Sequence, residues 1–455
     1  MLDKEKVHVG IDVGTTNITI VSCDISKKEV PITNSLPNKK IDTKEKYSYA
    51  QDPLYIEEMV KQLLILEKRS IASITVTGQV HGILYVDKDG KAVSPLYTWL
   101  DQRGMIEIDG ISSQLLLKER TGAHLPSGYG LLTHYANRRM GKVPPSAVGF
   151  CGILEYITGR LIGSPLQKSD PSTLGTYGSY NPIKGTFDQK VLDEVMGSDK
   201  ATFLTPSSPF EIAGYTTSGI PVTYPVGDNQ AGFFGMVSSW ESSALISIGT
   251  SGQLSLCSTS KESPPTMELR PFFGTHYLHV GATLTAGKAY EVLHSFIKSL
   301  FKASHIDIDD GTIFDIMKES ARNLEDIDPL VVDTRLSGTR REPTMRGSIT
   351  NIGLSNFTIG NMVKSTVDGI IGELQSFKED SPRSFEKIER IIATGSSVRK
   401  NYLFKEALQR SFDRDSIIAE VDDGAGFGAA LIGTVATKRC TIEETSKYIH
   451  TLLGT

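Results

Sequence analysis

The feature that most constrains the fold is a pattern that occurs twice, about half a chain apart. Apolar residues alternate over 7–13, a Gly-Thr-Thr-Asn turn follows at 14–17, and the alternation resumes at 18–20. This is expected of a strand, a tight turn and a returning strand. The segment 244–256, ALISIGTSGQLSL, repeats the pattern. Self-similarity at this distance indicates two related domains, because a solenoid repeats every ~20–50 residues.

Strands and helices alternate along the rest of the chain, which is typical of an α/β protein. Residues 53–69 carry apolar side chains near helical spacing, and Asp52 and Pro53 stand where an N-cap and a first-turn proline belong. A strand, a polar turn and another strand are expected over 71–86. We place the boundary near residue 240, after the polar stretch 238–243, which gives domains 1–240 and 241–455.

Composition excludes several classes of protein. A hydrophobic share of 39% and a charged share of 22% are ordinary for a globular chain, and the net charge of -5 gives no reason to expect a nucleic-acid partner. The sequence contains no run of ~18 apolar residues, so no transmembrane helix is expected. No signal segment is visible either. The four cysteines lie far apart, so reduced thiols in a cytoplasmic protein are expected rather than a zinc site or disulfides.

Both Gly-Thr turns contain the residue types that are suited to binding an anion. Glycine permits close backbone approach, successive amides form a concavity for anions, and threonine hydroxyls add donors. An aspartate beside them can hold magnesium through water. Either turn alone is most often only a hairpin, but the matching pair predicts a triphosphate held from two domains. The string GxxxxGK[ST] is absent, so this is not a Walker A loop.

Residues 227–232 read GDNQAG and present Asp228 in a loop bounded by glycine. A carboxylate in such a loop can approach a substrate hydroxyl and accept its proton, while phosphoryl transfer otherwise depends on positioning and charge stabilisation. The alternative is a simple Asp-Asn turn made with Asn229. The string alone does not decide between the two.

Two polar strings offer the donors and acceptors that a polyhydroxylated sugar needs: TGQVHG at 77–82 and TWLDQR at 98–103. The candidate sugar-side residues are Gln79, His81, Trp99, Asp101 and Arg103. The alternatives are a satisfied structural histidine, and a surface ion pair between Asp101 and Arg103 that contributes little.

Small residues gather in two further places. Residues 391–401, IIATGSSVRKN, predict a strand that ends in Gly395, Ser396 and Ser397, after which a helix begins. Residues 421–433, VDDGAGFGAALIG, predict a loop that opens a Gly/Ala-rich helix. Room for a flat base and tight helix packing are equal alternatives for this second segment.

Taken in order along nearly the whole chain, these motifs resemble the FGGY carbohydrate kinases, members of the sugar kinase, chaperone and actin superfamily. The resemblance implies an α/β fold of two ribonuclease H-like (actin-like ATPase) domains with ATP in a central cleft, and ATP and Mg²⁺ as cofactors. Asp228 looks like the catalytic base and, with Asn229, a sugar contact. Asp12 and Asp228 would help to position magnesium.

The resemblance also implies contacts to ATP from both halves of the chain. They fall on Asp12, Gly14, Thr15, Thr16, Gly249, Thr250, Gly287, Gly395, Ser396 and Asn401. Three departures stand out: Thr394–Ser396 replaces a Gly-Gly-Gly or Gly-Gly-Ala string, Leu284–Gly287 replaces a segment with Asn-Gly-Gly, and Val80 replaces a common methionine.

The sugar-side residues are similar to those of particular subfamilies. Gln-x-His-Gly is similar to xylulokinases and sedoheptulokinases, which both use ketoses, whereas glycerol kinases carry an Arg-Glu pair there. The stretches 98–104, 272–293 and 333–360 look more like sedoheptulokinases. The implied reaction is ATP-dependent formation of sedoheptulose 7-phosphate, in the pentose phosphate pathway. The alternatives are a xylulokinase, a kinase for another ketose or polyol, a non-catalytic sugar sensor, and an actin-like or chaperone-like ATPase. A homodimer is left open.

Overall fold

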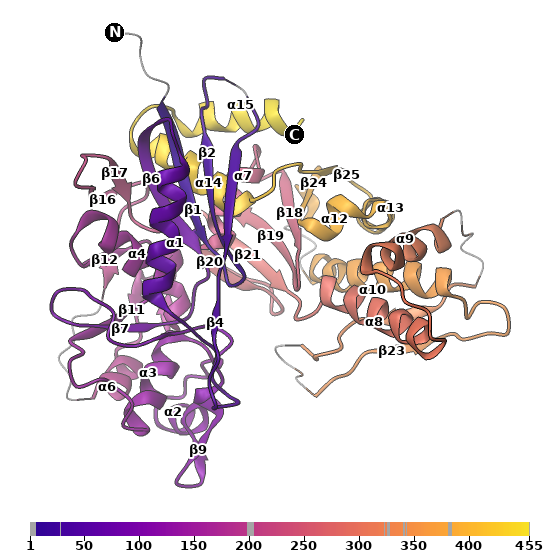
Figure 1. The fold of residues 1–455 in the computed structure, drawn as a ribbon, viewed down its shortest axis with the longest axis horizontal. Coiled ribbons are helices and arrows are strands. Elements are labelled where there is room, and N and C mark those ends of the chain that lie inside the picture. The colour runs from indigo at the N-terminus through magenta and orange to yellow at the C-terminus, as the bar shows by residue number, and fades with distance from the viewer. Residues whose placement is uncertain are drawn as a thin grey trace. The chain divides into compact units, whose positions relative to one another are not determined.

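The protein is described by a computed structural model that covers residues 6–27, 29–197, 204–322, 324, 328–339, 342, 344–380 and 385–454. Its internal contacts divide the chain into two units (Figure 1). Unit 1 comprises Met1–Ser238, Arg270–His276 and Asp423–Leu452. Unit 2 comprises Ser239–Leu269, Tyr277–Asp422 and Leu453–Thr455. The first change of unit falls close to the predicted boundary at residue 240, and the segment Asp423–Leu452 returns to unit 1.

Each unit contains a six-stranded sheet, and the two sheets share one plan. The strand orders are β16-β17-β6-β1-β2-β3 in unit 1 and β20-β21-β19-β18-β24-β25 for the second sheet. The hairpin β1–β2 corresponds to β18–β19, and each hairpin is antiparallel. In the first sheet β6 pairs with β1 and β17 pairs with β6, both in parallel. In the second sheet β24 pairs with β18 and β25 pairs with β24, again in parallel. The repeated strand, turn and strand pattern is therefore confirmed.

The main strands have the following bounds. In the first sheet they are β1 (Lys6–Val13), β2 (Asn17–Cys23), β3 (Ile32–Pro37), β6 (Ser70–Gly78), β16 (Ile212–Tyr215) and β17 (Pro221–Thr223). In the second they are β18 (Ser243–Ile248), β19 (Gly252–Ser258), β20 (Glu268–Pro271), β21 (Tyr277–Ala282), β24 (Arg390–Thr394) and β25 (Asp415–Ile418).

Helices and short strands complete the units. The helices are α1 (Pro53–Leu66), α2 (Ser113–Thr121), α3 (Gly130–Arg139), α4 (Ile153–Ile162), α5 (Pro171–Leu174), α6 (Gln189–Met196), α7 (Asp228–Met236), α8 (Gly287–Ala303), α9 (Asp310–Ser320), α10 (Ile359–Glu379), α12 (Ser396–Lys400), α13 (Tyr402–Phe412), α14 (Gly424–Ala436) and α15 (Ile442–Leu453), with 3-10 turns η1 (Arg103–Met105) and η2 (Gly175–Tyr177). The short strands are β4 (Lys40–Ile41), β5 (Ala50–Gln51), β7 (Leu84–Val86), β8 (Leu96–Tyr97), β9 (Glu107–Ile108), β10 (Ile111–Ser112), β11 (Gly149–Cys151), β12 (Lys168–Ser169), β13 (Tyr180–Asn181), β14 (Thr186–Phe187), β15 (Thr205–Pro206), β22 (Val331–Asp333) and β23 (Ser348–Thr350).

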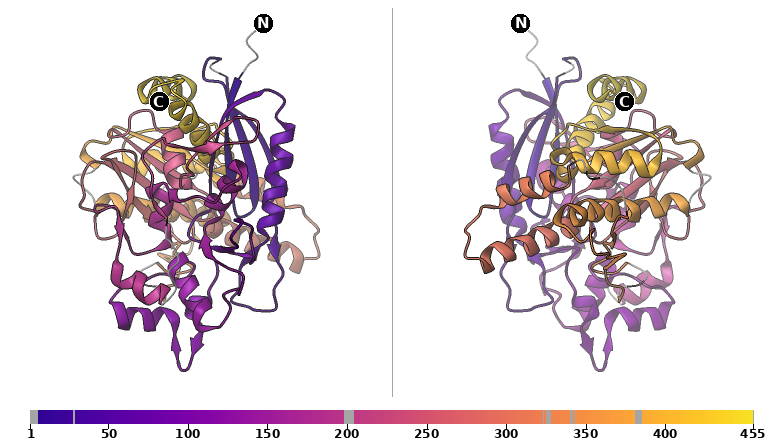
Figure 2. Two further views of the ribbon diagram at one scale, coloured as in Figure 1. Left: turned by 90° about the vertical axis from the view of Figure 1, so that its left-hand side faces the viewer. Right: turned by 90° about the vertical axis from the view of Figure 1, so that its right-hand side faces the viewer.

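The alternation of residues in β1 decides what each face of the first sheet contacts. Successive side chains of a strand point to opposite faces. The odd positions Val7, Val9, Ile11 and Val13 are fully buried in a cluster with residues of α1 and α4. The even positions, among them Gly10 and Asp12, face α14. Figure 2 shows α1 and α14 on opposite sides of this sheet.

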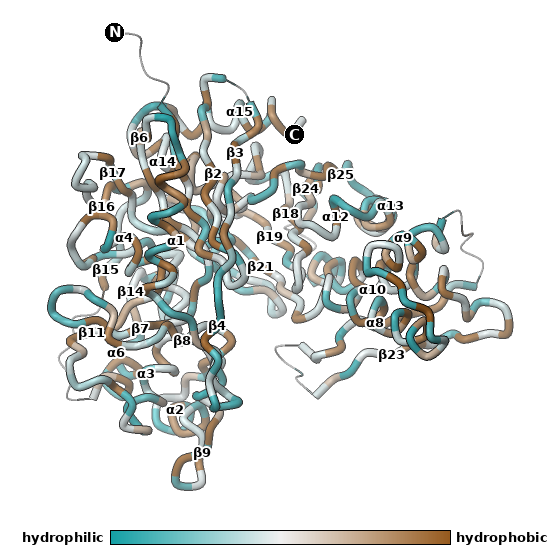
Figure 3. Tube along the Cα trace, viewed as in Figure 1, coloured by the Kyte–Doolittle hydropathy of each residue, from teal (hydrophilic) through white to brown (hydrophobic). Residues whose placement is uncertain are grey.

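Glycines let α14 lie directly on its neighbours. A Cβ on Gly428 of α14 would lie 1.7 Å from the carbonyl oxygen of Ala231 in α7, and one on Gly10 would lie 1.9 Å from the carbonyl oxygen of Gly426. Figure 3 colours much of this helix as hydrophobic. The glycines of 424–433 are therefore explained by tight packing, one of the two alternatives that the sequence left open.

Helix α1 begins as predicted and ends earlier. Asp52 accepts a hydrogen bond from the amide of Leu54 (2.9 Å), and Pro53 opens the helix. The helix ends at Leu66, whereas the apolar spacing extended the prediction to residue 69. The reason is local, because Glu67 adopts an extended backbone and binds the amide and the guanidinium of Arg69.

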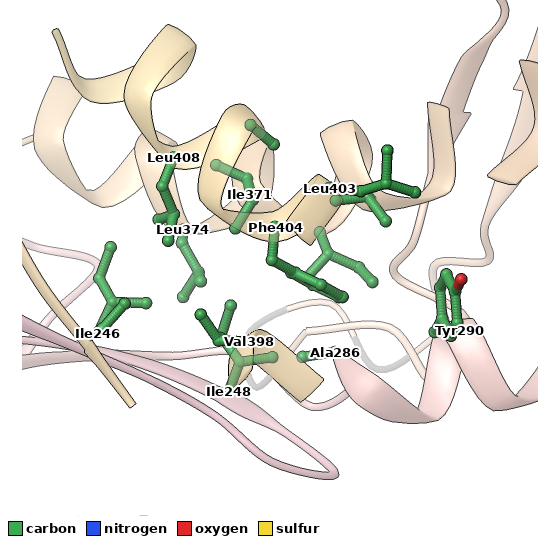
Figure 4. Close-up of a cluster of buried hydrophobic side chains, with 14 of the residues drawn as sticks. Ile246, Ile248, Ala286, Tyr290, Ile371, Leu374, Val398, Leu403, Phe404 and Leu408 are labelled. Atoms are coloured by element: carbon green, nitrogen blue, oxygen red, sulfur yellow. The ribbon is translucent and has the colours of Figure 1, made fainter. Parts of the chain in front are cut away.

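The core of unit 2 lies between its sheet and three long helices. Figure 4 shows Ile246 and Ile248 of β18 directed toward side chains of α10 and α13, among them Leu374 and Phe404. These side chains are all but inaccessible to solvent. The core holds the strand ends, and with them the turn after Ile248, in a fixed position.

The structure also describes the cysteines, the length of the helices and the stretch 333–360. All four cysteines are free thiols. Within the described ranges, no helix combines the length and the apolar character needed to cross a membrane. The stretch 333–360 contributes β23 and the start of α10, while Arg340, Arg341 and Pro343 in it lie outside the described residues.

Candidate active site

The first hairpin turn is held by its carbonyl oxygens. Four consecutive carbonyls accept hydrogen bonds from other segments of unit 1: Val13 from the amide of Gln79 (2.9 Å), Gly14 from Nδ2 of Asn38 (2.8 Å), Thr15 from Nε2 of Gln51 (2.8 Å) and Thr16 from the amide of Asn38 (2.7 Å). Carbonyl dipoles would repel an anion. Because they are bound to protein donors, the turn is suited to an anion approaching from its amide side.

The second hairpin turn is held in the same way, by the start of α8. The carbonyl oxygen of Gly249 accepts from the amide of Gly287 (2.9 Å), and that of Thr250 accepts from the amides of Ala286 (3.0 Å) and Lys288 (3.2 Å). A Cβ on Gly287 would lie 2.5 Å from the carbonyl oxygen of Gly249. Gly287, predicted as a nucleotide contact, is therefore required as glycine for the position of the turn.

A further pair of glycines repeats between the sheets. Gly78 ends β6 with φ +134°, and Gly395 follows β24 with φ +113°. A Cβ on either would lie within 2.4 Å of a carbonyl oxygen at the end of the first hairpin strand, that of Val13 or of Ile248. Both positions combine a left-handed backbone with no room for a side chain, so glycine is required at each.

Asp228 lies at the start of a helix rather than in the predicted loop. It is the first residue of α7, after Gly227 as N-cap, and its Oδ1 accepts a hydrogen bond from the amide of Asn229 (2.7 Å). The carboxylate is exposed to solvent. Partial loss of surrounding water raises the pKa of Asp228, and the charge of Arg270 and the Asn229 amide act in the opposite direction.

A short segment of unit 1 fixes the residue before Asp228. The amide of Gly227 donates to Oγ of Ser172 (2.9 Å), and the amide of Ser172 donates to Oδ1 of Asp170 (2.8 Å). Burial raises the pKa of Asp170 to about 6. A Cβ on Gly227 would lie 2.8 Å from Oε1 of Gln230, so the turn into α7 is also tightly packed.

Asp12 and Asp423 form a carboxyl pair that the sequence did not reveal. Asp12 is the last even residue before the end of β1, and Asp423 is the N-cap of α14, where it accepts from the amide of Gly426 (2.8 Å). Burial, together with repulsion from Asp423 and Asp228, raises the pKa of Asp12 well above its usual range. Burial also raises the pKa of Asp423.

This acidic group fits a hard cation held largely through water. Among the residues that the structure describes, no three histidine, cysteine or acidic side chains lie close enough to ligate one metal ion together. Mg²⁺ commonly keeps several waters and uses one or two carboxylates besides substrate phosphates. Asp12 offers such a carboxylate, and the repulsion that raises its pKa is what a cation would relieve.

Of the predicted sugar-side residues, Gln79 and Trp99 contact the first hairpin, and His81 is held by Thr176 and Tyr129. Trp99, 45% exposed, donates from Nε1 to Oγ1 of Thr15 (3.0 Å). His81 has φ +74°, its Nδ1 lies 3.0 Å from the carbonyl oxygen of Thr176, and its ring lies 4.3 Å from that of Tyr129. The half-buried ring thus has a fixed direction, as a ligand contact requires.

Asp101 and Arg103 form a fully buried ion pair, not a surface one. Arg103 donates from Nε and Nη2 to the two oxygens of Asp101 (2.7 and 2.9 Å), and its guanidinium lies 3.7 Å above the ring of Tyr97. The third guanidinium nitrogen, Nη1, donates to Oδ1 of Asn137 (2.5 Å). The pair fixes the turn that carries Trp99. Direct contact of these two side chains with a sugar stays a prediction.

The remaining predicted nucleotide residues lie in unit 2. Ser396 opens α12 directly after Gly395, so the strand ends at Thr394 and the helix begins earlier than the sequence predicted. Asn401 is buried and caps α13 by accepting from the amide of Leu403 (3.1 Å). Asn401 therefore has a structural role as the N-cap of α13, and its contact with adenosine stays a prediction.

Among the residues of the site that the sequence analysis missed are Gln51, Ser172 and Asp423. Asp423 carried a usable signal, since it stands where a helix N-cap is expected before the Gly/Ala-rich segment. Gln51 belongs to a two-residue strand and Ser172 to a four-residue helix. Neither element has a periodicity that a sequence could display, so only the folded chain connects them with the motifs.

Comparisons with known proteins agree with this geometry. Residues 7–235 match the FGGY family of carbohydrate kinases, N-terminal domain. Human sedoheptulokinase is 24% identical over 396 residues, 80% of this chain and 81% of that protein. The xylulose kinase of Staphylococcus xylosus is 24% identical over 458 residues, 94% of this chain and 90% of that protein. The crystal structure of a xyloylose kinase from Brucella ovis has a TM-score of 0.80 at 18% identity, covering 97% of this chain and 92% of that one. This likeness confirms the expected α/β fold of two actin-like domains.

Proposed function

Because this chain belongs to the FGGY family of carbohydrate kinases, we propose that it transfers the γ-phosphoryl group of ATP to the terminal hydroxyl of a ketose, with sedoheptulose preferred. The observation that carries the proposal is the position of Asp228. It is a solvent-accessible carboxylate with a raised pKa, set rigidly at the start of α7 in the unit that also holds the first hairpin.

Asp228 acts as the general base. A carboxylate with a raised pKa is a stronger base than an ordinary aspartate, and the charge of Arg270 favours its ionised form. It accepts the proton of the sugar hydroxyl as the oxygen attacks the γ-phosphorus in line. The hydrogen bond from Gly227 to Ser172 holds the start of α7, and with it the base, in place.

The two hairpin turns bind the phosphates. The amide sides of the turns at 14–16 and 249–250 supply donors, and the hydroxyls of Thr15, Thr16 and Thr250 add to them. Asp12 and Asp228 are the residues that would hold Mg²⁺, which neutralises phosphate charge when bound. Gly395, Ser396 and Asn401 stand at the adenosine end.

Sedoheptulose is preferred over xylulose on two grounds. Human sedoheptulokinase is one of the relatives, and three stretches of the chain look most like that subfamily. The Staphylococcus xylosus xylulose kinase aligns over more of the chain, which makes xylulose the second candidate. A non-catalytic sugar sensor is disfavoured because Asp12, Asp228 and both Gly-Thr turns are intact. A cytoplasmic location, a place in the pentose phosphate pathway and a homodimer belong to the same proposal.

The test is ADP release from ATP and Mg²⁺ across a panel of acceptors: sedoheptulose, xylulose, ribulose, fructose, glycerol and gluconate. The highest kcat/KM with sedoheptulose, and a product phosphorylated at the terminal carbon, would support the proposal. A higher value for xylulose or another sugar would replace the acceptor and leave the kinase assignment standing. Binding of ATP without stimulation by any sugar would favour the sensor.

A further inference from the structure

A closed ring of hydrogen bonds joins the first hairpin to the sugar-side residues. Gln79 donates from Nε2 to Oε1 of Gln51 (2.7 Å), and Gln51 donates from Nε2 to the carbonyl oxygen of Thr15 (2.8 Å). Oγ1 of Thr15 donates to Oε1 of Gln79 (3.4 Å) and closes the ring. From outside the ring, Nε1 of Trp99 donates to the same Thr15 hydroxyl (3.0 Å).

The carbonyl oxygen of Thr15 fixes the direction of every bond in this ring. A carbonyl oxygen can only accept, so Gln51 directs its NH₂ group to Thr15 and its Oε1 accepts from the NH₂ group of Gln79. Oε1 of Gln79 is then left as the acceptor for the single proton of the Thr15 hydroxyl, which also accepts from Nε1 of Trp99. Each of the two amides therefore has one favoured orientation.

The consequence concerns the proton of Thr15. A phosphate oxygen is an acceptor, so Thr15 cannot donate to it while its proton is engaged by Gln79. The Thr15–Gln79 bond is the longest in the ring at 3.4 Å, beyond the usual range of about 2.5–3.0 Å for O–H···O. It is accordingly the bond most easily exchanged for another.

We propose that Gln51 is a positioning residue that makes phosphate binding at the first hairpin depend on the sugar. A sugar hydroxyl that donates to Oε1 of Gln79 replaces Thr15 there, and Thr15 is released to donate to a phosphate oxygen of ATP. Gln51 is only 2% exposed and lies in β5, paired with β4 and β8, so it holds the Gln79 amide in the accepting orientation. The inference rests on the proposed function, because it requires sugar and ATP at these residues.

The variant Gln51→Met tests this coupling, because it keeps the length of the side chain and removes both of its hydrogen bonds. The measurement is the Kd of a non-hydrolysable ATP analogue with Mg²⁺, by calorimetry, with and without saturating sugar. In the native protein the sugar should tighten the analogue by about 5- to 150-fold, the usual range of such couplings. In Gln51→Met the ratio should fall to within about twofold of one, because Gln79 and Thr15 are no longer held to each other. ADP release without sugar should rise.

Gln114→Met is the matched control. Gln114 also donates from Nε2 to a backbone carbonyl, that of Leu125 (2.8 Å), in unit 1 and outside the ring. It should leave the ratio unchanged. If Gln51→Met does not fold, Trp99→Phe decides, since it removes, at an exposed position, the donor that holds the Thr15 hydroxyl beside Gln79, and it should also lower the ratio.

The outcomes separate the two proposals. A native protein that phosphorylates a sugar, with an unchanged ratio in both Gln51→Met and Trp99→Phe, overturns the coupling and leaves the kinase function intact. A native protein that phosphorylates none of the sugars fails the proposed function, and the coupling falls with it because there is no acceptor to release Thr15. A ratio lost equally in Gln114→Met would also contradict a specific role of Gln51.

Discussion

Gly10 in β1 and Gly426 in α14 lie against each other with no side chain between them, so that a Cβ on Gly10 would be 1.9 Å from the carbonyl oxygen of Gly426. The contact sets the distance between the sheet and the helix whose N-cap is Asp423. It therefore also sets how Asp423 meets Asp12, two residues along β1 on the same face. The carboxyl pair of the site depends on a position where no side chain is tolerated.

The substitution Gly10→Ala should destabilise the protein by about 1–3 kcal/mol, since the helix must move to admit the methyl group. It should also raise the Mg²⁺ concentration needed for activity, because Asp423 moves relative to Asp12. Urea unfolding and a Mg²⁺ titration measure the two effects. Gly149→Ala is the control, because a Cβ there meets nothing within 4 Å. Equal stability of the two variants would contradict the role of the contact.

The substitution Asp228→Asn should lower kcat by about 10²- to 10⁴-fold through loss of the general base, with the KM for sugar changed little. The melting temperature should be equal or higher, because partial loss of surrounding water disfavours the charged form that the substitution removes. Steady-state kinetics and thermal unfolding on one sample provide the comparison. Near-native turnover would exclude Asp228 as the base.

The substitution Asp423→Asn should weaken the binding of Mg²⁺ by about tenfold or more, since it removes a negative charge beside Asp12. Asparagine caps a helix as well as aspartate, so α14 should remain folded. The readout is Mg²⁺-dependent binding of a non-hydrolysable ATP analogue. Asp422→Asn controls for charge, because Asp422 is exposed and pairs with Arg399 (2.6 Å). A Mg²⁺ dependence identical in both variants would contradict the assignment.

The substitution Gly287→Ala should raise the KM for ATP by roughly tenfold or more while the KM for sugar stays close to native. The added methyl group displaces the second hairpin from α8, and small displacements of binding groups are costly. Gly372→Ala, in α10 of the same unit, adds a methyl group where nothing lies within 4 Å and should have no such effect. A rise in both KM values would instead indicate general disruption.

His8 should make the protein sensitive to acid. Burial, with a contribution from Arg439, lowers the pKa of His8 from 6.5 to about 4. Between these values the unfolded chain binds the proton more tightly, so this contribution to stability is complete above pH 6.5 and is lost as the pH falls toward 4. The loss is at most about 1.4 kcal/mol per pH unit. His8→Gln should flatten this dependence in urea unfolding at pH 7 and pH 5, and an unchanged slope would exclude His8 as its source.

The sequence predicted the parts of the fold that repeat a local pattern. The two hairpins, α1 and the strand before Gly395 were all foreseeable from alternation and capping residues, and the structure confirms them. The sequence singled out Asp228 as a candidate site residue but placed it in a loop, because α7 is fixed by glycine contacts with α14 some 200 positions later in the chain.

The missed residues share a physical cause. Gln51 acquires its role through pairing of β5 with β8, and Asp423 through the contact of α14 with β1, so both depend on long-range packing. A surface ion pair was the alternative that the sequence left open for Asp101 and Arg103, since charges are usually exposed. The ion pair is buried because protein groups replace the contacts that water would make. The ring of Tyr97 and the amide oxygen of Asn137 contact Arg103, and the backbone amide of Tyr49 donates to Asp101.

The return of Asp423–Leu452 to unit 1 has a consequence for how the chain is made. Translation is vectorial, and domains in general fold as they emerge from the ribosome, N-terminal ones first. Unit 1 cannot follow that order, because the helix that covers the Gly10 face of its sheet is synthesised only after all but a few residues of unit 2. Until then, this face of the nascent sheet is bare and needs protection from aggregation, and any premature stop before residue 423 would damage the first half of the protein as well as the last.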